Sequence, residues 1–216
     1  MNLNKYIDHT LLKPEATKQQ IIELCKQARE YEFASVCVNG CWVETCKQEL
    51  KDTNIAVCTT IGFPLGATST VAKAYETKEA LADGATEFDM VINIGALKEG
   101  NLDYVTDDIA AVVKAANGHV VKVIIETCLL SKEEIAQACR CAVQAKASFV
   151  KTSTGFSSAG ANVDDVKMMA EIVHPAGLKV KASGGIKYAE TFMAMIEAGA
   201  DRIGCSAGIA IMQGLK

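Results

Sequence analysis

Long hydrophobic runs and an excess of basic residues are both missing from this 216-residue sequence. No apolar run reaches the roughly 18 residues that cross a membrane, and residues 1–5 lack the apolar segment of a secretory signal. The formal net charge is −4, which argues against a nucleic-acid-binding surface, because such a surface needs clustered basic side chains. The sequence therefore predicts a cytoplasmic protein with neither a membrane nor a nucleic-acid partner.

Histidine is scarce, and cysteine, although abundant, lacks the spacing of a metal site. The three histidines, His9, His119 and His174, form no His-x-His or His-x-x-x-His pair. The nine cysteines form no Cys-x-x-Cys motif and are scattered through helical and strand patterns. Thiols in this number are typical of a reducing compartment, where they mostly pack as small apolar residues. We therefore predict that the protein needs no metal.

Hydrophobic residues make up half of the sequence, in alternating strand and helix patterns. A chain of this length can build one large core. Strands that alternate with helices, without hairpin signals, indicate one parallel sheet, and a count of eight favours a closed (β/α)8 TIM barrel over an open sheet. We see no linker and predict a single α/β domain over residues 1–216. The predicted strands cover residues 6–12, 34–38, 55–61, 87–94, 120–126, 149–153, 178–183 and 202–205.

Two lysines stand inside predicted strands, and each strand then runs into a turn rich in serine and glycine. They are Lys151 and Lys181, in similar contexts thirty residues apart. A lone strand lysine usually packs its stem and extends its ammonium to water. Two of them, each before a glycine turn, fit that explanation poorly, because ammonium groups are costly to bury unpaired. We therefore interpret both lysines as catalytic.

A carboxylate among apolar neighbours, Asp89, is the natural partner of these lysines. A buried Asp–Lys pair that only fixes packing is the alternative, but it does not explain two lysines for one carboxylate. Two close ammonium groups disfavour each other's charge, so one is pushed towards the neutral amine. A neutral amine can attack a carbonyl and form a Schiff base. Lys122 could join this network, although it comes early in its strand.

The active site of a TIM barrel lies at the carboxyl ends of its strands. Polar residues at the predicted strand ends therefore form a candidate barrel mouth. They are Asp8, Asn39, Gly62, Asp89, Asn93, Glu126, Lys151, Lys181 and Ser206.

Glycine turns after the seventh and eighth strands predict an anion site. Gly184 and Gly185 follow one strand, and residues 204–208 follow the other. Backbone N–H groups in such turns can close on phosphate oxygens, and barrels often bind phosphate at these two strand ends. Lys187 is near enough in sequence to add a positive charge.

Six of these segments, in order along nearly the whole chain, resemble the deoxyribose-phosphate aldolase family. They are IDHTLLKP (7–14), GFPLG (62–66), EFDMVIN (87–93), VKTSTG (150–155), VKASGG (180–185) and RIG (202–204). The resemblance implies a metal-free, cofactor-free class I aldolase on a (β/α)8 barrel. Such an enzyme reversibly cleaves 2-deoxy-D-ribose 5-phosphate to acetaldehyde and D-glyceraldehyde 3-phosphate, in deoxyribonucleoside catabolism. It also implies a homodimer.

The resemblance further implies a role for each matching residue. Lys151 would form the Schiff base with acetaldehyde, Lys181 would favour its neutral form and relay protons, and Asp89 would donate and accept protons. The expected phosphate-binding residues are Gly155, Gly184, Gly185, Lys187, Gly204 and Ser206. The expected supporting polar network consists of Asp8, Thr10 and Lys122.

The sequence departs from the family pattern at several positions. Phe156 stands where some relatives carry a lysine, and Cys-Ser-Ala at 205–207 replaces a run of hydroxyl residues, so phosphate binding is expected to depend more on backbone amides. Asn39 is not followed by the expected proline. Cys37, late in its strand, either faces the aldehyde site as a target for electrophilic aldehydes or packs as a core thiol.

Other functions remain to be weighed against the aldolase. A sugar-phosphate isomerase or epimerase would use the same barrel and phosphate turns, but gives no reason for two strand lysines. A zinc aldolase would need clustered histidines, and a non-enzymatic sugar-phosphate-binding regulator would not need a carboxylate between two lysines.

Overall fold

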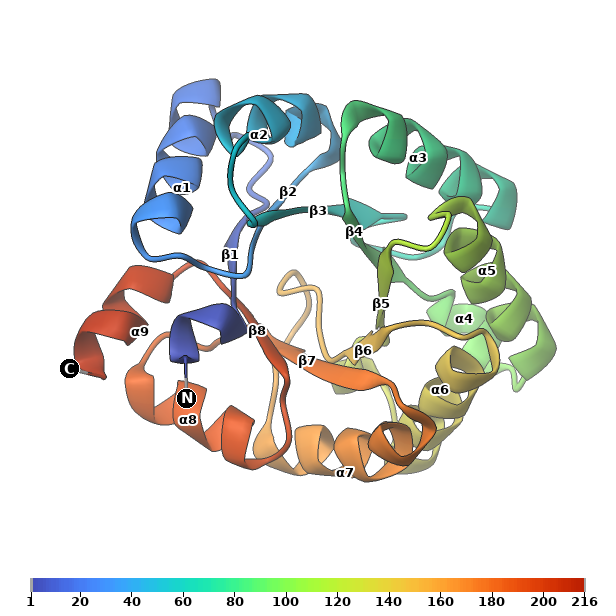
Figure 1. Cartoon of the computed structure of the whole chain (residues 1–216). Helices are drawn as coiled ribbons and strands as arrows, with labels where there is room; N and C mark the ends of the chain where they lie inside the picture. The colour runs from blue at the N-terminus through green and yellow to red at the C-terminus, as the bar shows by residue number, and fades with distance from the viewer. Residues whose placement is uncertain (1, 216) are drawn as a thin grey trace.

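Eight parallel strands form a closed barrel in the computed structural model, which describes residues 2–215 (Figure 1). Each strand pairs with the next along the chain, and β8 closes the ring against β1. The predicted (β/α)8 TIM barrel is therefore confirmed. The strands are β1 Ile7–Leu11, β2 Ser35–Val38, β3 Ala56–Ile61, β4 Glu87–Val91, β5 Val120–Ile124, β6 Phe149–Lys151, β7 Lys179–Ser183 and β8 Arg202–Cys205.

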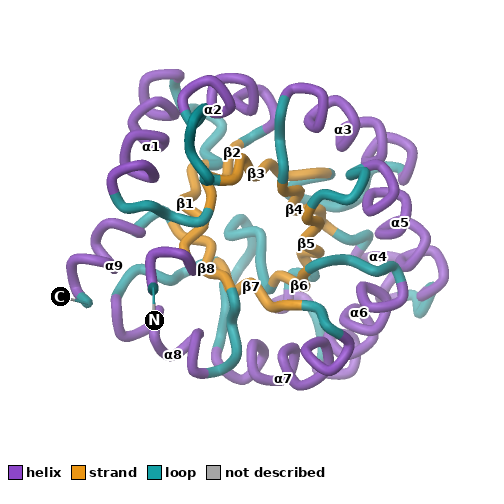
Figure 2. Tube along the Cα trace, in the orientation of Figure 1, coloured by secondary structure: helices purple, strands orange, loops and turns teal. Residues whose placement is uncertain are grey.

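Helices surround the strand ring (Figure 2). The α-helices are α1 Lys18–Glu30, α2 Val43–Glu49, α3 Thr70–Asp83, α4 Ile94–Lys98, α5 Leu102–Ala115, α6 Lys132–Gln144, α7 Val163–Val173, α8 Ala189–Glu197 and α9 Gly208–Gly214. Short 3-10 helices are η1 Leu3–Tyr6, η2 Gly40–Trp42, η3 Thr127–Leu129 and η4 His174–Ala176. None of the helices within residues 2–215 has the length and apolarity to cross a membrane.

Local sequence signals explain where the outer helices begin. Thr17 caps α1 and Ser131 caps α6, each in a capping box with Gln20 or Glu134 three residues later. At the other end of α3, Gly84 takes a left-handed conformation with φ of 110°, which glycine adopts without steric cost. These residues fix where α1 and α6 begin and where α3 ends.

The strands alternate between a hydrophobic outer layer and a polar barrel interior. On β4, Phe88 and Met90 belong to the hydrophobic core between strands and helices, whereas Asp89 between them does not. Val150 and Val180 belong to the same core, and the lysines that follow them point to the other face of the sheet. The apolar residues hold the barrel to its helices and the intervening residues bring charge to its centre.

Three strands end two or more residues earlier than the alternation predicts, including β5, which was predicted over 120–126 and ends at Ile124. The predicted strand over 87–94 stops at Val91 because Asn93 caps α4, its Oδ1 accepting the Ala96 N–H at 3.0 Å. The strand predicted over 149–153 stops at Lys151, after which the chain turns through the Thr154–Gly155 region. These early ends leave polar residues, among them Glu126, in loops at the carboxyl end of the barrel.

Candidate active site

A buried cluster of four cations and three carboxylates fills the barrel interior. Strands β1, β4, β5, β6, β7 and β8 contribute its members, which project inward because of the two-residue alternation. The cations are Lys122, Lys151, Lys181 and Arg202, and the carboxylates are Asp8, Glu87 and Asp89. Charges buried this deeply must be paired, so the cluster is a connected network.

Asp89 lies at the centre of the network and contacts three lysines. Its Oδ2 is 2.7 Å from the Nζ of Lys151 and 2.7 Å from the Nζ of Lys181. Its Oδ1 is 2.9 Å from Lys122 Nζ and accepts the Cys58 thiol at 3.1 Å. Burial alone would raise the pKa of the Asp89 carboxyl, but the three ammonium groups hold that pKa well below its usual range. Asp89 is therefore an ionised carboxylate.

Lys181 is held between two carboxylates. Its Nζ lies 2.6 Å from Asp8 Oδ2 as well as 2.7 Å from Asp89 Oδ2. Burial favours the neutral amine, but these two carboxylates hold the pKa of Lys181 above its ordinary value. Glycine at position 204 makes room for this side chain, because a Cβ there would lie 3.0 Å from Lys181 Cε.

Lys122 has more carboxylate partners than either of the other lysines. Its Nζ lies 2.6 Å from Glu87, 2.9 Å from Asp89 and 3.9 Å from Asp8. Burial favours the neutral form, but the carboxylates, Asp89 foremost, raise the pKa of Lys122 well above its ordinary value. Its position early in the strand thus places it in the centre of the network, one layer below the barrel mouth.

Lys151 differs from its two neighbours in having one carboxylate partner, Asp89, among the residues that the structure describes. The expectation that like charge pushes a lysine towards neutrality does not hold for Lys122 or Lys181, because carboxylates outweigh the repulsion there. With all seven groups ionised, four positive and three negative charges leave a surplus of one positive charge.

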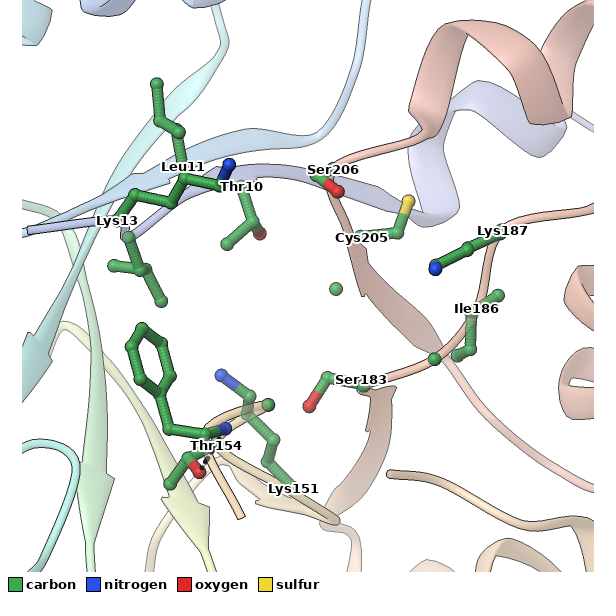
Figure 3. Close-up of a pocket in the computed structure, with 16 residues that line it drawn as sticks. Thr10, Leu11, Lys13, Lys151, Thr154, Ser183, Ile186, Lys187, Cys205 and Ser206 are labelled. Atoms are coloured by element: carbon green, nitrogen blue, oxygen red, sulfur yellow. Dashed lines mark hydrogen bonds between the residues drawn. The ribbon is translucent and has the colours of Figure 1, made fainter. Parts of the chain in front are cut away.

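A cavity of about 240 Å³ opens above the cluster at the carboxyl end of the barrel (Figure 3). The Lys151 amine points into it, and the loops after β1, β6, β7 and β8 form its walls. Asp89, Lys122 and Lys181 lie below the cavity and are not part of its lining. The lining residues are Thr10, Leu11, Leu12, Lys13, Lys151, Thr154, Gly155, Phe156, Ser183, Gly184, Gly185, Ile186, Lys187, Gly204, Cys205 and Ser206.

Comparison with known proteins agrees with this geometry. Residues 3–214 match the DeoC/LacD family of aldolases. The chain belongs to this family. It is 60% identical over 214 residues to a deoxyribose-phosphate aldolase of Bdellovibrio bacteriovorus, covering 99% of this chain and 97% of that protein. It is 58% identical over 214 residues, with the same coverage, to the corresponding protein of Streptococcus sanguinis.

Solved structures show the same barrel. The tetrameric deoxyribose phosphate aldolase from Aeropyrum pernix superposes with a TM-score of 0.92 at 32% identity, covering 99% of this chain and 90% of that one. These similarities make the chain an aldolase-family lyase and give no support to the isomerase or epimerase alternative.

Within this aldolase barrel, the residues expected to bind phosphate come together. Gly155, Gly184, Gly185, Lys187, Gly204 and Ser206 all line the cavity. Thr10 lines it too, and its hydroxyl donates to the Asp8 carbonyl at 2.8 Å. Asp8 itself was expected near the end of its strand. It is instead the second residue of β1, so it joins the network from the amino-terminal part of its strand.

Cys37 does not line the cavity. It is fully buried with Leu12 and Cys58, and the half-buried Phe63 packs against them. Leu12 also lines the cavity, so Cys37 packs against a residue of the cavity wall. Cys37 is thus a packed thiol directly beneath the site.

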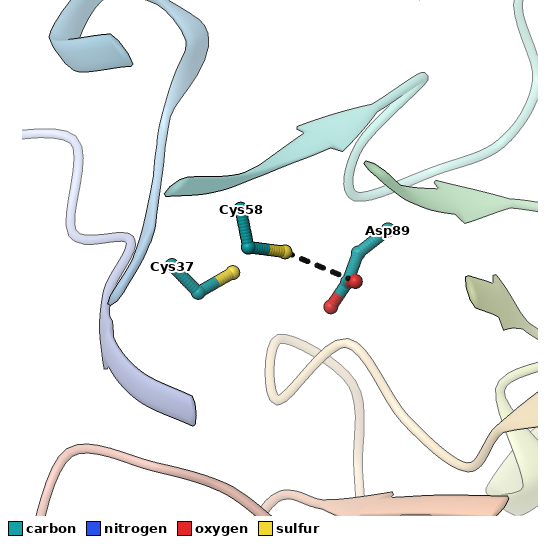
Figure 4. A group of neighbouring side chains, drawn as sticks. All are labelled: Cys37, Cys58 and Asp89. Atoms are coloured by element: carbon teal, nitrogen blue, oxygen red, sulfur yellow. Dashed lines mark hydrogen bonds between the residues drawn. The ribbon is translucent and has the colours of Figure 1, made fainter. Parts of the chain in front are cut away.

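Two thiols and a carboxylate lie close enough to suggest a metal centre (Figure 4). The Sγ atoms of Cys37 and Cys58 and an oxygen of Asp89 lie within 4.8 Å of one another. However, lysine ammonium groups already occupy both oxygens of Asp89, and Lys122 Nζ lies 3.4 Å from Cys58 Sγ. A hydrogen bond with Cys58 lowers the pKa of Cys37, whereas burial raises that of Cys58 well above its usual range. Lysine ammonium groups therefore lie beside the carboxylate and one of the two thiols of this cluster.

Sequence reasoning gave no role to three members of the site. Cys58 donates to Asp89, Glu87 pairs with Lys122, and the Nε of Arg202 donates to Asp8 at 2.7 Å. Glu87 could have been found, because it is two residues before Asp89 and therefore shares its face. Arg202 could not have been found in this way. It is 194 positions from Asp8 in the sequence, and the two meet only because β8 pairs with β1.

Proposed function

We propose that this chain is a class I aldolase that reversibly cleaves 2-deoxy-D-ribose 5-phosphate to D-glyceraldehyde 3-phosphate and acetaldehyde. The observation that carries the proposal is the position of Lys151. Its amine points into the cavity while its one carboxylate partner, Asp89, is shared with two further lysines. The curated relatives carry the name of this activity.

The reaction begins when the neutral Lys151 amine attacks the C1 aldehyde of the open-chain sugar. Loss of water gives a protonated imine, which withdraws electrons from the adjacent bonds. A base removes the proton of the C3 hydroxyl, the C2–C3 bond breaks, and glyceraldehyde 3-phosphate leaves. The bonding electrons remain on the lysine-bound fragment as an enamine.

Protonation of the enamine at C2 gives the acetaldehyde imine, and water then releases acetaldehyde and restores the amine. We assign these proton transfers to Asp89 and Lys181, because Asp89 Oδ2 lies 2.7 Å from the Nζ of Lys151 and 2.7 Å from that of Lys181. Asp8, Lys122 and Arg202 hold that pair in position. No metal or organic cofactor has a step in this scheme.

The phosphate would bind at the glycine turns that follow β7 and β8 and line the cavity. Gly184 and Gly185 have φ of 86° and 79°, a conformation that favours glycine, and both line the cavity, where backbone N–H groups of a turn can bind an anion. Lys187 and Ser206 add a cation and a hydroxyl to this wall. Binding the phosphate there would leave the aldehyde end of the sugar near Lys151.

Product analysis separates this function from the isomerase alternative. The purified protein is incubated with 2-deoxyribose 5-phosphate, and acetaldehyde and glyceraldehyde 3-phosphate are quantified with and without a chelator. An aldolase releases the two in equal amounts, with no effect of the chelator, whereas an isomerase leaves a single five-carbon product. Lys151→Ala should abolish cleavage, and Lys179→Ala, which removes an exposed strand lysine two residues before Lys181, should not.

The expected homodimer is part of the same proposal. The Aeropyrum pernix structure is described as a tetramer, so the assembly varies within the family or this chain also forms a larger one. Light scattering of the purified protein would distinguish monomer, dimer and tetramer. The proposed location is the cytoplasm, where sugar phosphates from deoxyribonucleoside breakdown are found.

A further inference from the structure

A buried carboxylate outside the catalytic cluster supports the turn that follows β6. Glu126 lies two residues after the end of β5, is 3% exposed, and forms no ion pair among the described residues. Its oxygens accept the Thr154 N–H at 3.2 and 3.3 Å, and the Thr154 hydroxyl donates to Oε2. The Cys128 thiol lies 3.9 Å from Oε1. Among the residues of the cavity wall, Glu126 therefore hydrogen-bonds to Thr154 alone.

The backbone of Glu126 shows that its position is specified. Its φ is 56°, in the left-handed region that side chains other than glycine, asparagine and aspartate rarely adopt. Such conformations persist where the surrounding structure over-determines them, and they gather at functional sites. On either side of it, Ile125 N–H donates to Lys151 O at 3.0 Å and Thr127 N–H to Thr152 O at 2.9 Å. The left-handed conformation of Glu126 thus lies between two backbone hydrogen bonds that join the segment after β5 to Lys151 and Thr152.

These hydrogen bonds leave one amide of the turn available. Thr154 N–H is taken by Glu126, and Phe156 N–H donates to the Thr154 hydroxyl oxygen at 3.0 Å. The Gly155 N–H between them has no partner among residues 2–215, and Gly155 is an exposed residue of the cavity wall. An unpaired backbone amide in the wall of this cavity can donate a hydrogen bond to an anionic ligand such as phosphate.

We propose that Glu126 is a positioning residue for the phosphate group of the substrate, an inference that rests on the proposed function. By accepting both donors of Thr154 it fixes the 154–156 turn in the form that presents only the Gly155 N–H to the cavity. Glu126 itself does not touch the substrate. The carboxylate orders the turn after β6, which lies beside the turn of Gly184 and Gly185 after the neighbouring strand β7, so that amides of both turns can bind the phosphate.

Two substitutions at this position separate positioning from bulk. Glu126→Met keeps the length of the side chain and removes both acceptors, whereas Glu126→Gln retains one oxygen that can accept from Thr154 N–H. Glu134→Met is the matched control, because Glu134 also accepts a backbone N–H, from Ser131 at 2.7 Å, but lies outside the cavity lining. Thermal unfolding followed by circular dichroism verifies that each variant is folded. Thr154→Val, which removes the hydroxyl and keeps the shape, replaces Glu126→Met if that variant does not fold.

The first readout is the ratio of kcat/KM for 2-deoxyribose 5-phosphate to that for 2-deoxyribose. A lost hydrogen bond to a charged group corresponds to about a tenfold loss in binding. We expect the ratio to fall about tenfold in Glu126→Met, mainly through KM, to fall less in Glu126→Gln, and to stay constant in Glu134→Met. Proportional losses for both substrates in a folded Glu126→Met protein would overturn the proposal. Absence of cleavage by the parent would instead refute the proposed function.

The second readout does not depend on catalysis. Inorganic phosphate is titrated into the ¹⁵N-labelled protein, and the amide signal of Gly155 is followed by NMR. We expect this signal to shift in the parent and in Glu134→Met, and to respond only at higher phosphate concentration in Glu126→Met. A Gly155 signal that ignores phosphate in the parent, while the signals of Gly184 and Gly185 respond, would contradict the role given to Glu126.

Discussion

At the scale of single residues, the site depends on one carboxylate shared by three lysines. Asp89 stays ionised because Lys122, Lys151 and Lys181 surround it, and Asp8 stays ionised because Lys181 and Arg202 oppose the effect of its burial. Both carboxylates therefore have pKa values below the usual range. The carboxylates in turn raise the pKa values of Lys122 and Lys181 above the ordinary value of a lysine.

These shifts make stability depend on pH on the acid side. A carboxyl whose pKa is lower in the folded state contributes stability above its unfolded pKa and loses it as pH falls towards the folded pKa. We expect the free energy of unfolding of the parent to fall between about pH 4 and pH 2. Asp8→Asn removes one such group, so its free energy of unfolding should fall less steeply, by up to about 1.4 kcal/mol per pH unit. Urea unfolding at several pH values measures both slopes, and equal slopes would show that Asp8 titrates alike in the folded and unfolded chains.

At the scale of elements, a second buried ion pair joins α3 and α5 to the end of β4. Lys73 Nζ lies 2.5 Å from Asp108 Oδ2 and donates to the Val91 carbonyl at 2.9 Å, and Thr70 donates to Asp108 Oδ1 at 2.8 Å. Lys73 also packs where a Cβ on Gly62 would lie 2.9 Å from its Cε, so glycine is required there. The pair holds two outer helices against the strand that carries Asp89.

Replacing one member of this ion pair should lower the free energy of unfolding more than replacing both members by apolar residues. Lys73→Met or Asp108→Leu alone leaves one buried charge without its partner, which costs about 3–5 kcal/mol of the free energy of unfolding. The double variant buries two apolar side chains instead and should recover much of that loss. A double-mutant cycle by urea unfolding tests this. Single variants that lose less than about 1 kcal/mol would mean that the pair contributes little.

At the scale of the whole molecule, barrel closure explains what could be predicted from the sequence and what could not. The fold followed from eight alternating segments, and Lys151, Lys181 and Asp89 stood out because charge inside a strand is costly. Pairings such as Asp8 with Arg202 depend on β8 meeting β1, which no local pattern records. Glu126 was recognised as a polar strand end, but its turn-forming role needed the hydrogen bonds. Lys122 was expected only in a supporting role because it comes early in its strand, whereas its ammonium contacts Glu87 and Asp89 directly.

The central claim is that Lys151 is the nucleophile, and trapping tests it most directly. The protein is incubated with acetaldehyde, reduced with borohydride and digested, and the adduct is located by mass spectrometry. Lys151→Ala and Lys179→Ala are treated in parallel, and labelling of exposed lysines measures simple reductive alkylation. We expect an ethyl group on Lys151 in the parent and in Lys179→Ala, at a level well above that on exposed lysines. Labelling of Lys151 no greater than that of exposed lysines would contradict it.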